Sequence, residues 1–505
     1  MSFSKVYSAQ CQYLKTEIID IEIDISTGLH SIKIVGLTDK AVEESSSRVS
    51  SAIKNSGYKS PKQKNQKLVI SLAPAHVKKN GSLFDLGIAL AYLKASKDID
   101  FEIKDRLFIG ELSLNGNLRP VTGILPMVKF AKESGYKEIF LPLKNTSEAS
   151  LISGIKIFGA QNLNDVINHI NTNKKKKVLI ESQKPTLIKK EFNENKIDFS
   201  DIKGQEKAKR GLEIAAAGGH NIAFYGPPGT GKTMLAKAFS GILPLLNFED
   251  IISVTSIYSV SGLLNKSYIQ EPPFRSPHHT SSYVSIFGGG NNIKPGEITL
   301  AHKGVLFLDE IPEFEKRVIE GLRQPLEDKE INISRAKQSI KYPSNFILIT
   351  TMNPCPCGYS ETGIKRCSCN LNQILNYKQK ISGPIRDRID IWIEVNQIDN
   401  KKLLEKTKVS NISPLIRSRV ESTRLIQLKR FGKINSDLTS KEIEQKINLD
   451  KKVKDLLINS AKQLELSPRS VHKIIKIART IADLEPSIEI KDSHILEALQ
   501  YRPKV

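Results

Sequence analysis

The sequence lacks a long hydrophobic run. No segment of it approaches the roughly 20 apolar residues that a membrane-spanning helix requires. The first residues, MSFSKVYSAQCQYLKTE, place no apolar core behind a basic start, so we expect no signal peptide. We therefore predict a cytoplasmic protein without a membrane partner.

Cysteine and acidic residues are both scarce. The chain has five Cys, four of them within residues 355–369, and in a cytoplasmic protein such a cluster favours a metal site over disulfides. Lys and Arg number 76 against 54 Asp and Glu, a formal charge of +22 that admits a polyanionic partner such as nucleic acid. The chain is also rich in Lys, Asn and Ile, a skew that biased nucleotide composition produces by itself, so the charge is weak support.

The length of 505 residues, with 39% apolar residues, suits about two to four domains with ordinary cores. We predict an α/β domain over 1–172 and a lysine-rich linker over 173–200. The four consecutive lysines at 174–177 are more simply explained as a solvated charge run than as a binding site. An α/β nucleotide-binding core follows over 201–400, and a helical domain over 401–505. The overall class is α/β.

The N-terminal domain shows alternating strand patterns. Residues 17–25 alternate apolar and polar side chains, and residues 31–35 are placed to pair with them across Gly28. Helical spacing is seen at 39–55 and 83–93.

Residues 221–239, NIAFYGPPGTGKTMLAKAF, carry the most specific motif. An apolar strand pattern enters G-x-x-x-x-G-K-[ST], and a helical pattern leaves it, which is the context that a phosphate-binding loop needs. The glycines let backbone N–H groups surround a polyphosphate, while Lys232 reaches the β/γ-phosphates and the Thr233 hydroxyl can ligate Mg²⁺. The predicted ATP-binding residues are Gly226, Pro227, Pro228, Gly229, Thr230, Gly231, Lys232 and Thr233.

Two more apolar strands end in polar residues. Val305–Leu308 leads into Asp309 and Glu310, which suit Mg²⁺ binding and polarisation of the attacking water. Residues 345–352 lead into Asn353, whose amide can orient that water. Alone, each would also fit an ordinary turn after a strand. Beside a phosphate loop, the catalytic interpretation is favoured.

Residues 327–342 indicate a β-hairpin. Two alternating arms, 330–334 and 338–342, flank a basic tip with Arg335 and Lys337. Such a tip can bind a phosphate backbone without reading its sequence, although many solvated hairpins also carry charges.

The cysteine cluster consists of two C-x-C pairs, Cys355 and Cys357 followed by Cys367 and Cys369. Four thiolates brought together by a short loop suit a closed, structural Zn²⁺ site. The spacing is tighter than C-x-x-C, so an iron–sulfur site or free thiols stay open as alternatives. His278 and His279 have no Cys or third His nearby and are interpreted as structural or nucleotide-adjacent.

The N-terminal domain resembles the proteolytic domain of the Lon family, which is related to ribosomal protein S5 domain 2. The resemblance lies in GELSLNGNLRPVTGI (110–124) and GYKEIFLP (135–142). Peptidases of that family use a Ser activated by a Lys. Here Leu83–Asp85 lie near the expected Ser, and Ser82 and Lys129 are out of register. We predict a scaffold without peptidase activity.

Almost the whole chain resembles the YifB/ComM family of magnesium-chelatase-like AAA+ ATPases. The matching segments are KGQEKAKRGLEIAAAGGHN (203–221), FRSPHHT (274–280), PGEITLAHKGVLFLDEIPEF (295–314), LRQPLEDKEINISRA (322–336), TMNPCPCG (351–358), ISGPIRDRID (381–390) and ARTIADL (478–484). The resemblance implies a homo-hexameric DNA motor, of which ComM members drive branch migration during integration of transformed DNA. It also implies an AAA+ core with a helical lid.

The resemblance assigns further roles. Asn353 matches sensor 1, Arg388 the arginine finger that reaches a neighbour's γ-phosphate, and Arg469 the sensor 2 helix. Ile385-Arg386 replaces two leucines that are usual in the family, so Arg386 competes with Arg388 as the finger. A structural Arg paired with Asp387 or Asp390 is the simpler alternative. Arg479 is expected to form a salt bridge in the lid.

In the same branch of AAA+ proteins, two insertions line the pore of the ring. The hairpin with Arg335 and Lys337 matches the pre-sensor 1 hairpin, and residues 249–300 match the helix 2 insert. Two other functions compete with a DNA motor: a magnesium-chelatase motor that remodels a partner protein, and an ATP-dependent protease.

Overall fold

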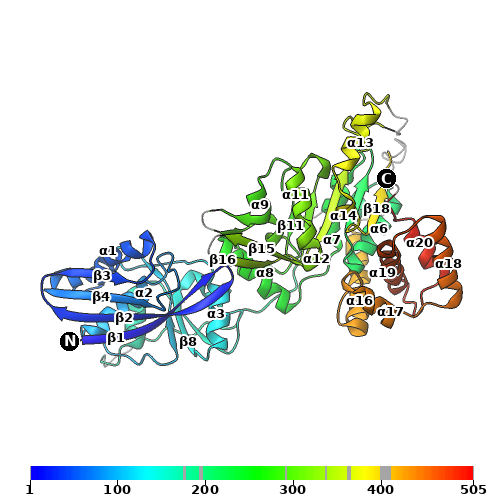
Figure 1. Ribbon diagram of the computed structural model, residues 1–505. Coiled ribbons are helices and arrows are strands. Elements are labelled where there is room, and N and C mark those ends of the chain that lie inside the picture. Colours follow the sequence, from blue (N-terminus) through cyan, green and yellow to red (C-terminus); the bar gives the residue numbers. More distant parts are fainter. Residues whose placement is uncertain are drawn as a thin grey trace. The chain divides into compact units, whose positions relative to one another are not determined.

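The computed structural model describes residues 2–173, 178–192, 197–290, 293–335, 338–360, 365–397 and 411–503, and the statements below concern these residues. The chain forms two compact units (Figure 1). The N-terminal unit contains Met1–Lys189 and Phe248–Ile269, and the C-terminal unit contains Lys190–Asn247 and Gln270–Val505. Each unit is α/β, as the sequence predicts.

The N-terminal unit is built on a four-stranded sheet of order β1-β2-β4-β3, a parallel sheet of order β5-β8-β9 and the small hairpin β6–β7. Its elements are β1 (Ser2–Gln12), β2 (Lys15–Thr27), β3 (Ser31–Val35), α1 (Lys40–Asn55), β4 (Gln66–Ala73), α2 (Asp85–Ala95), β5 (Arg106–Phe108), β6 (Glu111–Leu112), β7 (Leu118–Arg119), α3 (Ile124–Glu133), β8 (Glu138–Pro142), α4 (Thr146–Ala149), β9 (Lys156–Ala160), α5 (Leu163–Ile170) and α8 (Phe248–Ser261).

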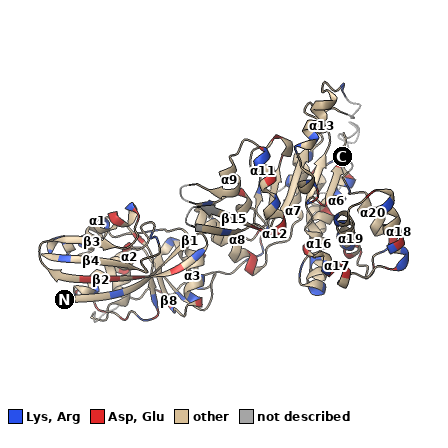
Figure 2. Ribbon diagram, viewed as in Figure 1, with Lys and Arg blue, Asp and Glu red and all other residues tan. Residues whose placement is uncertain are grey.

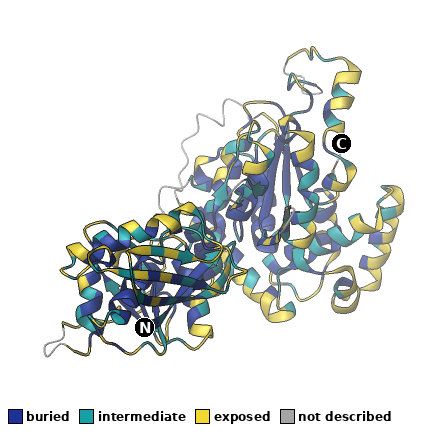
Figure 3. Ribbon diagram, turned by 60° about the vertical axis from the view of Figure 1, so that its left-hand side comes forward, coloured by how far each residue is buried: buried dark blue, intermediate teal, exposed yellow. Residues whose placement is uncertain are grey.

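Strand β2 shows how the sequence pattern sets the sheet. Ile19, Ile21, Ile23 and Ile25 are buried, while the acidic residues between them are not. Because side chains alternate along a strand, one face packs on α2 and the other meets solvent. Figure 3 shows this alternation of buried and exposed residues along the strands.

The predicted pairing of 31–35 with 17–25 is wrong. Strand β3 pairs in parallel with β4, and β4 lies between β3 and β2. The physical reason is the crossover helix α1 between β3 and β4, since parallel neighbours need such a connection and a tight turn cannot supply it.

Part of the predicted linker belongs to the N-terminal unit. Within 178–189, Ile180 N–H donates to His169 Nδ1, Gln183 N–H to the Ile157 carbonyl and Thr186 N–H to the Ser150 carbonyl. The polar composition gave no sign of these bonds, because backbone groups make them.

Residues 248–269 also depart from the predicted domains. The sequence places them in the nucleotide-binding core, as part of an insertion that lines a pore, whereas α8 packs against α3 of the N-terminal unit. Gly123 N–H donates to the Ser259 hydroxyl at 3.0 Å, and Ile252 joins a core with Leu125 and Val128. The chain therefore leaves the C-terminal unit at Asn247 and returns to it at Gln270.

The C-terminal unit has a parallel five-stranded sheet of order β11-β14-β17-β10-β18. Its core elements are α6 (Glu206–Gly218), β10 (Ile222–Tyr225), α7 (Lys232–Ile242), β11 (Phe274–Arg275), α9 (Tyr283–Phe287), β12 (Gly288–Gly289), β13 (Lys294–Pro295), α10 (Glu297–Leu300), β14 (Val305–Leu308), α11 (Lys316–Gly321), α12 (Arg323–Asp328), β15 (Glu330–Arg335), β16 (Gln338–Pro343), β17 (Ile347–Met352), α13 (Leu371–Gln379), α14 (Gly383–Arg386) and β18 (Ile391–Glu394).

A group of helices follows this core in the chain, and we call it the lid: α16 (Ser413–Phe431), α17 (Ser440–Lys446), α18 (Lys451–Gln463), α19 (Pro468–Leu484) and α20 (Asp492–Leu499). Sheet and lid share one hydrophobic core, in which Phe224 and Leu212 join Ile474 and Ile481. The predicted hairpin is confirmed, because β15 and β16 pair in antiparallel register from Glu330↔Pro343 to Arg335↔Gln338. Lys and Arg are spread over many elements of both units (Figure 2).

Candidate active site

The phosphate-binding loop joins β10 to α7, as the sequence predicts. Gly229 and Gly231 have φ of +78° and +87°, a region that favours glycine. Gly226 is needed for another reason: a Cβ there would lie 2.2 Å from the carbonyl oxygen of Val395. The loop therefore opens onto the N-terminus of the 11-residue α7, whose free N–H groups and positive dipole end suit a phosphate.

Lys232 is buried in the loop. Its Nζ donates to the carbonyls of Gly226 and Pro227 at 2.7 and 2.8 Å, and to Asn353 Oδ1 at 3.0 Å. Burial lowers the pKa of Lys232 to about 8, although the charges of Asp309 and Glu310 act in the opposite direction. The ammonium is thus held within reach of two carboxylates and of the loop's backbone.

Asp309 follows β14 and lies beside the start of α7. Its Oδ2 accepts from the Thr233 hydroxyl at 3.0 Å, and its Oδ1 accepts from the Thr351 hydroxyl at 2.5 Å. A hydroxyl and a carboxylate are the oxygen donors that Mg²⁺ takes together with substrate phosphates. The predicted Mg²⁺ ligands Thr233 and Asp309 are therefore adjacent.

Glu310 and Asn353 meet at the ends of adjacent strands. Asn353 Nδ2 donates to Glu310 Oε1 at 3.2 Å, while its Oδ1 accepts from Lys232. Glu310 has φ of +54°, and its backbone N–H donates to Thr351 Oγ1 at 2.8 Å. One amide therefore connects the carboxylate suited to activate water with the lysine of the phosphate loop.

Two residues of this network were missed from sequence. Thr351 contacts Asp309 and Glu310 at once, and a Thr inside an apolar strand two residues before Asn353 was the available signal. Asn221, directly before β10, accepts from Leu348 N–H at 2.8 Å and donates to the Arg388 carbonyl at 2.9 Å. Asn221 ends the segment GGHN (218–221), and no sequence pattern indicates a role for it.

The two predicted γ-phosphate arginines lie together. Arg388 and Arg469 line a pocket of about 480 Å³, and the described residues around that pocket include none of the phosphate loop. Arg388 pairs with Glu327 and donates to the Pro384 carbonyl at 2.7 Å; the alternative pairing with Asp387 or Asp390 is not the one observed. The competitor Arg386 donates to the carbonyls of Lys378 and Ile381.

The lid matches two predictions. Ser467 caps α19 by accepting from Ser470 N–H at 3.2 Å, with Pro468 in the first turn and Arg469 beside it. Arg479 forms the expected salt bridge, with its Nε 3.0 Å from Asp483 Oδ1.

The predicted DNA-contacting residues are Arg335 and Lys337, at the point in the chain where β15 ends and before β16 begins. Arg335 ends strand β15, but its side chain lies outside the described residues, as does the whole of Lys337. Their contact with DNA stays a prediction. The rings of His278 and His279 lie at a tilt to each other, with centroids 4.1 Å apart, and His278 Nδ1 forms a hydrogen bond with the Thr280 hydroxyl.

The four clustered cysteines form one group. Their Sγ atoms all lie within 4.8 Å of one another, and Cys355 is buried. Sγ of Cys357 lies 3.3 Å from that of Cys355 and 3.5 Å from that of Cys367. Backbone hydrogen bonds from Tyr359 and Ser368 lower the pKa of Cys357 to about 5, which favours a thiolate. The group has the composition of a closed Zn²⁺ site.

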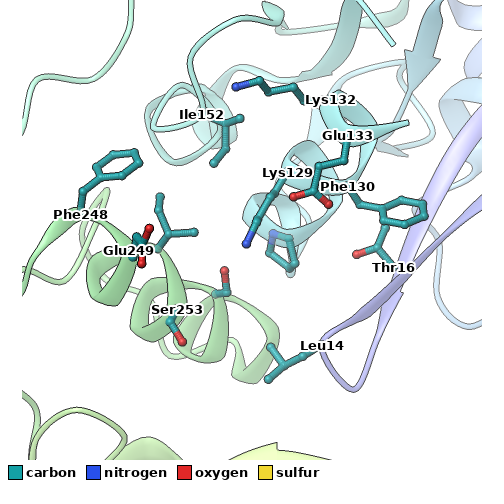
Figure 4. Close-up of a pocket in the computed structure, with 13 residues that line it drawn as sticks. Leu14, Thr16, Lys129, Phe130, Lys132, Glu133, Ile152, Phe248, Glu249 and Ser253 are labelled. Carbon is teal, nitrogen blue, oxygen red and sulfur yellow. The ribbon is translucent and has the colours of Figure 1, made fainter. Parts of the chain in front are cut away.

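The N-terminal unit separates the residues of the rejected dyad. Ser82 donates to Glu111, whereas Lys129 of α3 lines a pocket of about 810 Å³ with Ser253 and other residues of α8 (Figure 4). Ser82 does not line that pocket.

These features define a P-loop ATPase of the AAA+ class with a helical lid, for which ATP and Mg²⁺ are the implied nucleotide and metal. Three family models match the chain: "Magnesium chelatase, subunit ChlI" over 198–403, "Subunit ChlI of Mg-chelatase" over 21–145 and "Magnesium chelatase, subunit ChlI C-terminal" over 410–502. Within the described residues, every helix is too short or too polar to span a bilayer.

Full-length relatives give a narrower assignment. The chain is 42% identical to competence protein ComM of Haemophilus influenzae, covering 100% of this chain and 98% of that protein. It is 40% identical to the protein YifB of Escherichia coli, covering 99% and 97%. A magnesium-chelatase 38 kDa subunit of Cereibacter sphaeroides is 24% identical over 31% of this chain and 52% of its own length. The chain belongs to the YifB/ComM family of magnesium-chelatase-like AAA+ proteins.

Proposed function

We propose that this chain is the subunit of an ATP-driven, hexameric DNA motor that promotes branch migration when transformed DNA recombines. The observation that carries the proposal is the full-length match to competence protein ComM, combined with a phosphate loop beside which the predicted Mg²⁺ ligands and the water-activating carboxylate lie together. The net charge of +22 is compatible with a polyanionic partner.

The residues divide the chemistry of hydrolysis among them. Lys232 and the loop N–H groups bind the phosphates, and Thr233 with Asp309 would hold Mg²⁺, which when bound neutralises charge that develops on the phosphate oxygens. Glu310 accepts the proton of the attacking water, and Asn353 fixes that carboxylate by a 3.2 Å hydrogen bond.

The arginines support a ring. Arg388 and Arg469 line a pocket whose described residues include none of the phosphate loop, which supports a role for their guanidinium groups at the nucleotide of an adjacent copy. Each ATP site is then completed by arginines of the neighbouring subunit, so that hydrolysis in one subunit is coupled to the conformation of the next. Arg335 and Lys337 at the hairpin tip would contact the DNA phosphates that the ring moves along.

A protein-remodelling ATPase of the magnesium-chelatase type is the second candidate. The family models that match the chain favour it by their descriptions, but the individual chelatase subunit covers about a third of the chain. The two functions differ in what stimulates hydrolysis: DNA in one, a partner protein in the other.

The test is ATP hydrolysis by the purified protein alone and with single-stranded, duplex and branched DNA. Lys232→Ala is the blank. We expect stimulation by DNA that is lost in Arg335→Ala/Lys337→Ala and kept in Lys341→Ala, a matched control because Lys341 lies on an arm of the same hairpin, paired with Glu330. The salt dependence of DNA binding should weaken by about 1 in log–log slope per lost phosphate contact. A rate indifferent to every DNA would exclude the motor and favour remodelling of a protein.

A further inference from the structure

The cysteine cluster lies next to an active-site residue along the chain. Asn353, which bonds Lys232 and Glu310, lies two residues before Cys355. The strand β17 ends at Met352, so no regular hydrogen-bond ladder fixes the backbone between Asn353 and the first thiol.

A second connection comes from the other end of the loop. Tyr377 of α13 is buried, and its hydroxyl hydrogen-bonds with the backbone of Asn353; burial raises the pKa of Tyr377, and this bond opposes the shift. Asn353 precedes the four cysteines in the chain, and Tyr377, which follows them, contacts its backbone.

The third connection is a packing contact with the phosphate loop. Gly358 has φ of +84°, and a Cβ built there would lie 2.6 Å from Pro228 Cδ. The turn directly after Cys357 thus rests on the loop that binds phosphate, with no room for a side chain between them.

Among the described residues of the loop, few apolar side chains are buried. Cys355 is fully buried, but Cys357, Cys367 and Cys369 are partly exposed, and Lys365 and Arg366 are exposed. Bonds from four thiolates to one ion would supply the cohesion that apolar burial does not.

From these contacts we infer that a divalent zinc-like ion held by Cys355, Cys357, Cys367 and Cys369 positions Asn353 and the phosphate loop, so that occupancy of this centre sets the rate of ATP hydrolysis. The cysteines are positioning residues and do not touch the nucleotide. The inference rests on the ATP hydrolysis assigned above and not on DNA movement, so all of its measurements are made without DNA.

The first experiment removes the metal from the intact protein. Bound metal is measured by elemental analysis, then withdrawn with a chelator and restored with Zn²⁺ or Co²⁺, whose thiolate complexes absorb characteristically. We expect one ion per chain, a fall in kcat of about tenfold to a hundredfold on removal, and recovery on refilling. Affinity for a fluorescent ATP analogue should fall by less than kcat, because Lys232 and the loop N–H groups are still present although the loop loses the support of Gly358. Two results would overturn the inference. One is a protein that contains no metal as purified and binds no added Co²⁺; the other is an unchanged kcat after the metal has been removed.

Variants separate position from stability. Cys357→Ser/Cys367→Ser should lose both the ion and kcat, whereas Cys11→Ala, the fifth cysteine and outside the cluster, should keep both. Gly358→Ala should keep the ion and lower kcat, since it disturbs the contact with Pro228 and leaves all four thiols. Full kcat in Gly358→Ala, with the ion bound, would refute the packing contact.

A double-mutant cycle tests the route through Asn353. If the ion acts by placing this amide, withdrawing it from Asn353→Ala costs far less than withdrawing it from the unaltered protein. Equal losses in both proteins would contradict positioning and indicate a general structural role. Failure of DNA to stimulate the unaltered protein would leave these basal rates measurable, so the two proposals fail separately.

Discussion

At the scale of the residue, Lys232 has an unusual titration. Its pKa is lowered from 10.5 to about 8 by burial, so the folded chain binds fewer protons than the unfolded chain between these values. The cost of burying the charge is present in full below about pH 8 and is relieved as the pH rises toward 10.5. Phosphate binds the protonated Lys232 ammonium, so bound phosphate favours the protonated form and opposes loss of this proton.

We predict that ATP binding weakens above pH 8 and is then coupled to proton uptake. At pH 9 the affinity should fall by up to about tenfold relative to pH 7. Calorimetry in two buffers of different ionisation enthalpy should detect uptake of a proton at pH 9 and none at pH 7. Lys232→Arg, which stays charged, is the control and should show no such pH dependence. A wild-type affinity that is constant from pH 7 to 9 would exclude the lowered pKa.

Glu310 carries the second prediction at this scale. Glu310→Gln keeps the hydrogen bond geometry to Asn353 but cannot accept a proton, so ATP should bind while hydrolysis falls by about 10²- to 10⁴-fold. Single-turnover kinetics and nucleotide binding, measured on one preparation, check this. The control is Glu313→Gln, three residues along the chain and paired with Lys380. Loss of nucleotide binding in Glu310→Gln would show that this carboxylate has a structural role instead.

At the scale of the element, helices α1 and α2 are joined by a buried ion pair. Arg48 Nε lies 3.0 Å from Asp85 Oδ2, and Asp85 is fully buried at the start of α2, where it also accepts from Leu112 N–H. Asp85 belongs to the segment where a peptidase of the Lon type would carry its nucleophile. Here that position holds the two helices together.

Arg48→Ala should therefore destabilise the N-terminal unit by about 3–5 kcal/mol, because it leaves a carboxylate buried without its cation. Urea unfolding followed by circular dichroism measures the change. Lys5→Ala removes the partner of Asp20 from a pair in which both side chains are about one third exposed, and should cost less than about 1 kcal/mol. Similar losses in the two variants would mean that burial does not decide the strength of these pairs.

At the scale of the whole molecule, the two units share one chain that passes between them more than once. Helix α8 lies in the N-terminal unit although both of its flanking segments belong to the C-terminal unit. Its buried residues Ile252, Val254 and Ile257 lie on different sides of the helix, which is typical of an element that is enclosed by its neighbours.

We predict that one cut between the units does not separate them. Cleavage after the exposed Lys189 or Lys190 should give two fragments that elute together in native size exclusion and separate in denaturant, because α8 of the second fragment fills the core of the first. Fragments that separate under native conditions would show that α8 contributes little to that core.

The sequence alone determined the features that depend on neighbours along the chain. The phosphate loop, the strand ends with Asp309, Glu310 and Asn353, the hairpin register and the cap at Ser467 all follow from turn chemistry and periodicity within about ten residues. The cysteine spacing likewise predicted the cluster that the structure shows.

Tertiary structure decided what depends on distant partners. It set β4 beside β2 in place of β3, enclosed α8 in the N-terminal unit, bonded residues 178–189 to that unit and brought Asn353 and Gly358 onto the phosphate loop. Each of these outcomes comes from packing of surfaces far apart in the chain. Local propensity is blind to such partners, because the free energy that selects them comes from apolar burial and backbone pairing in the folded state.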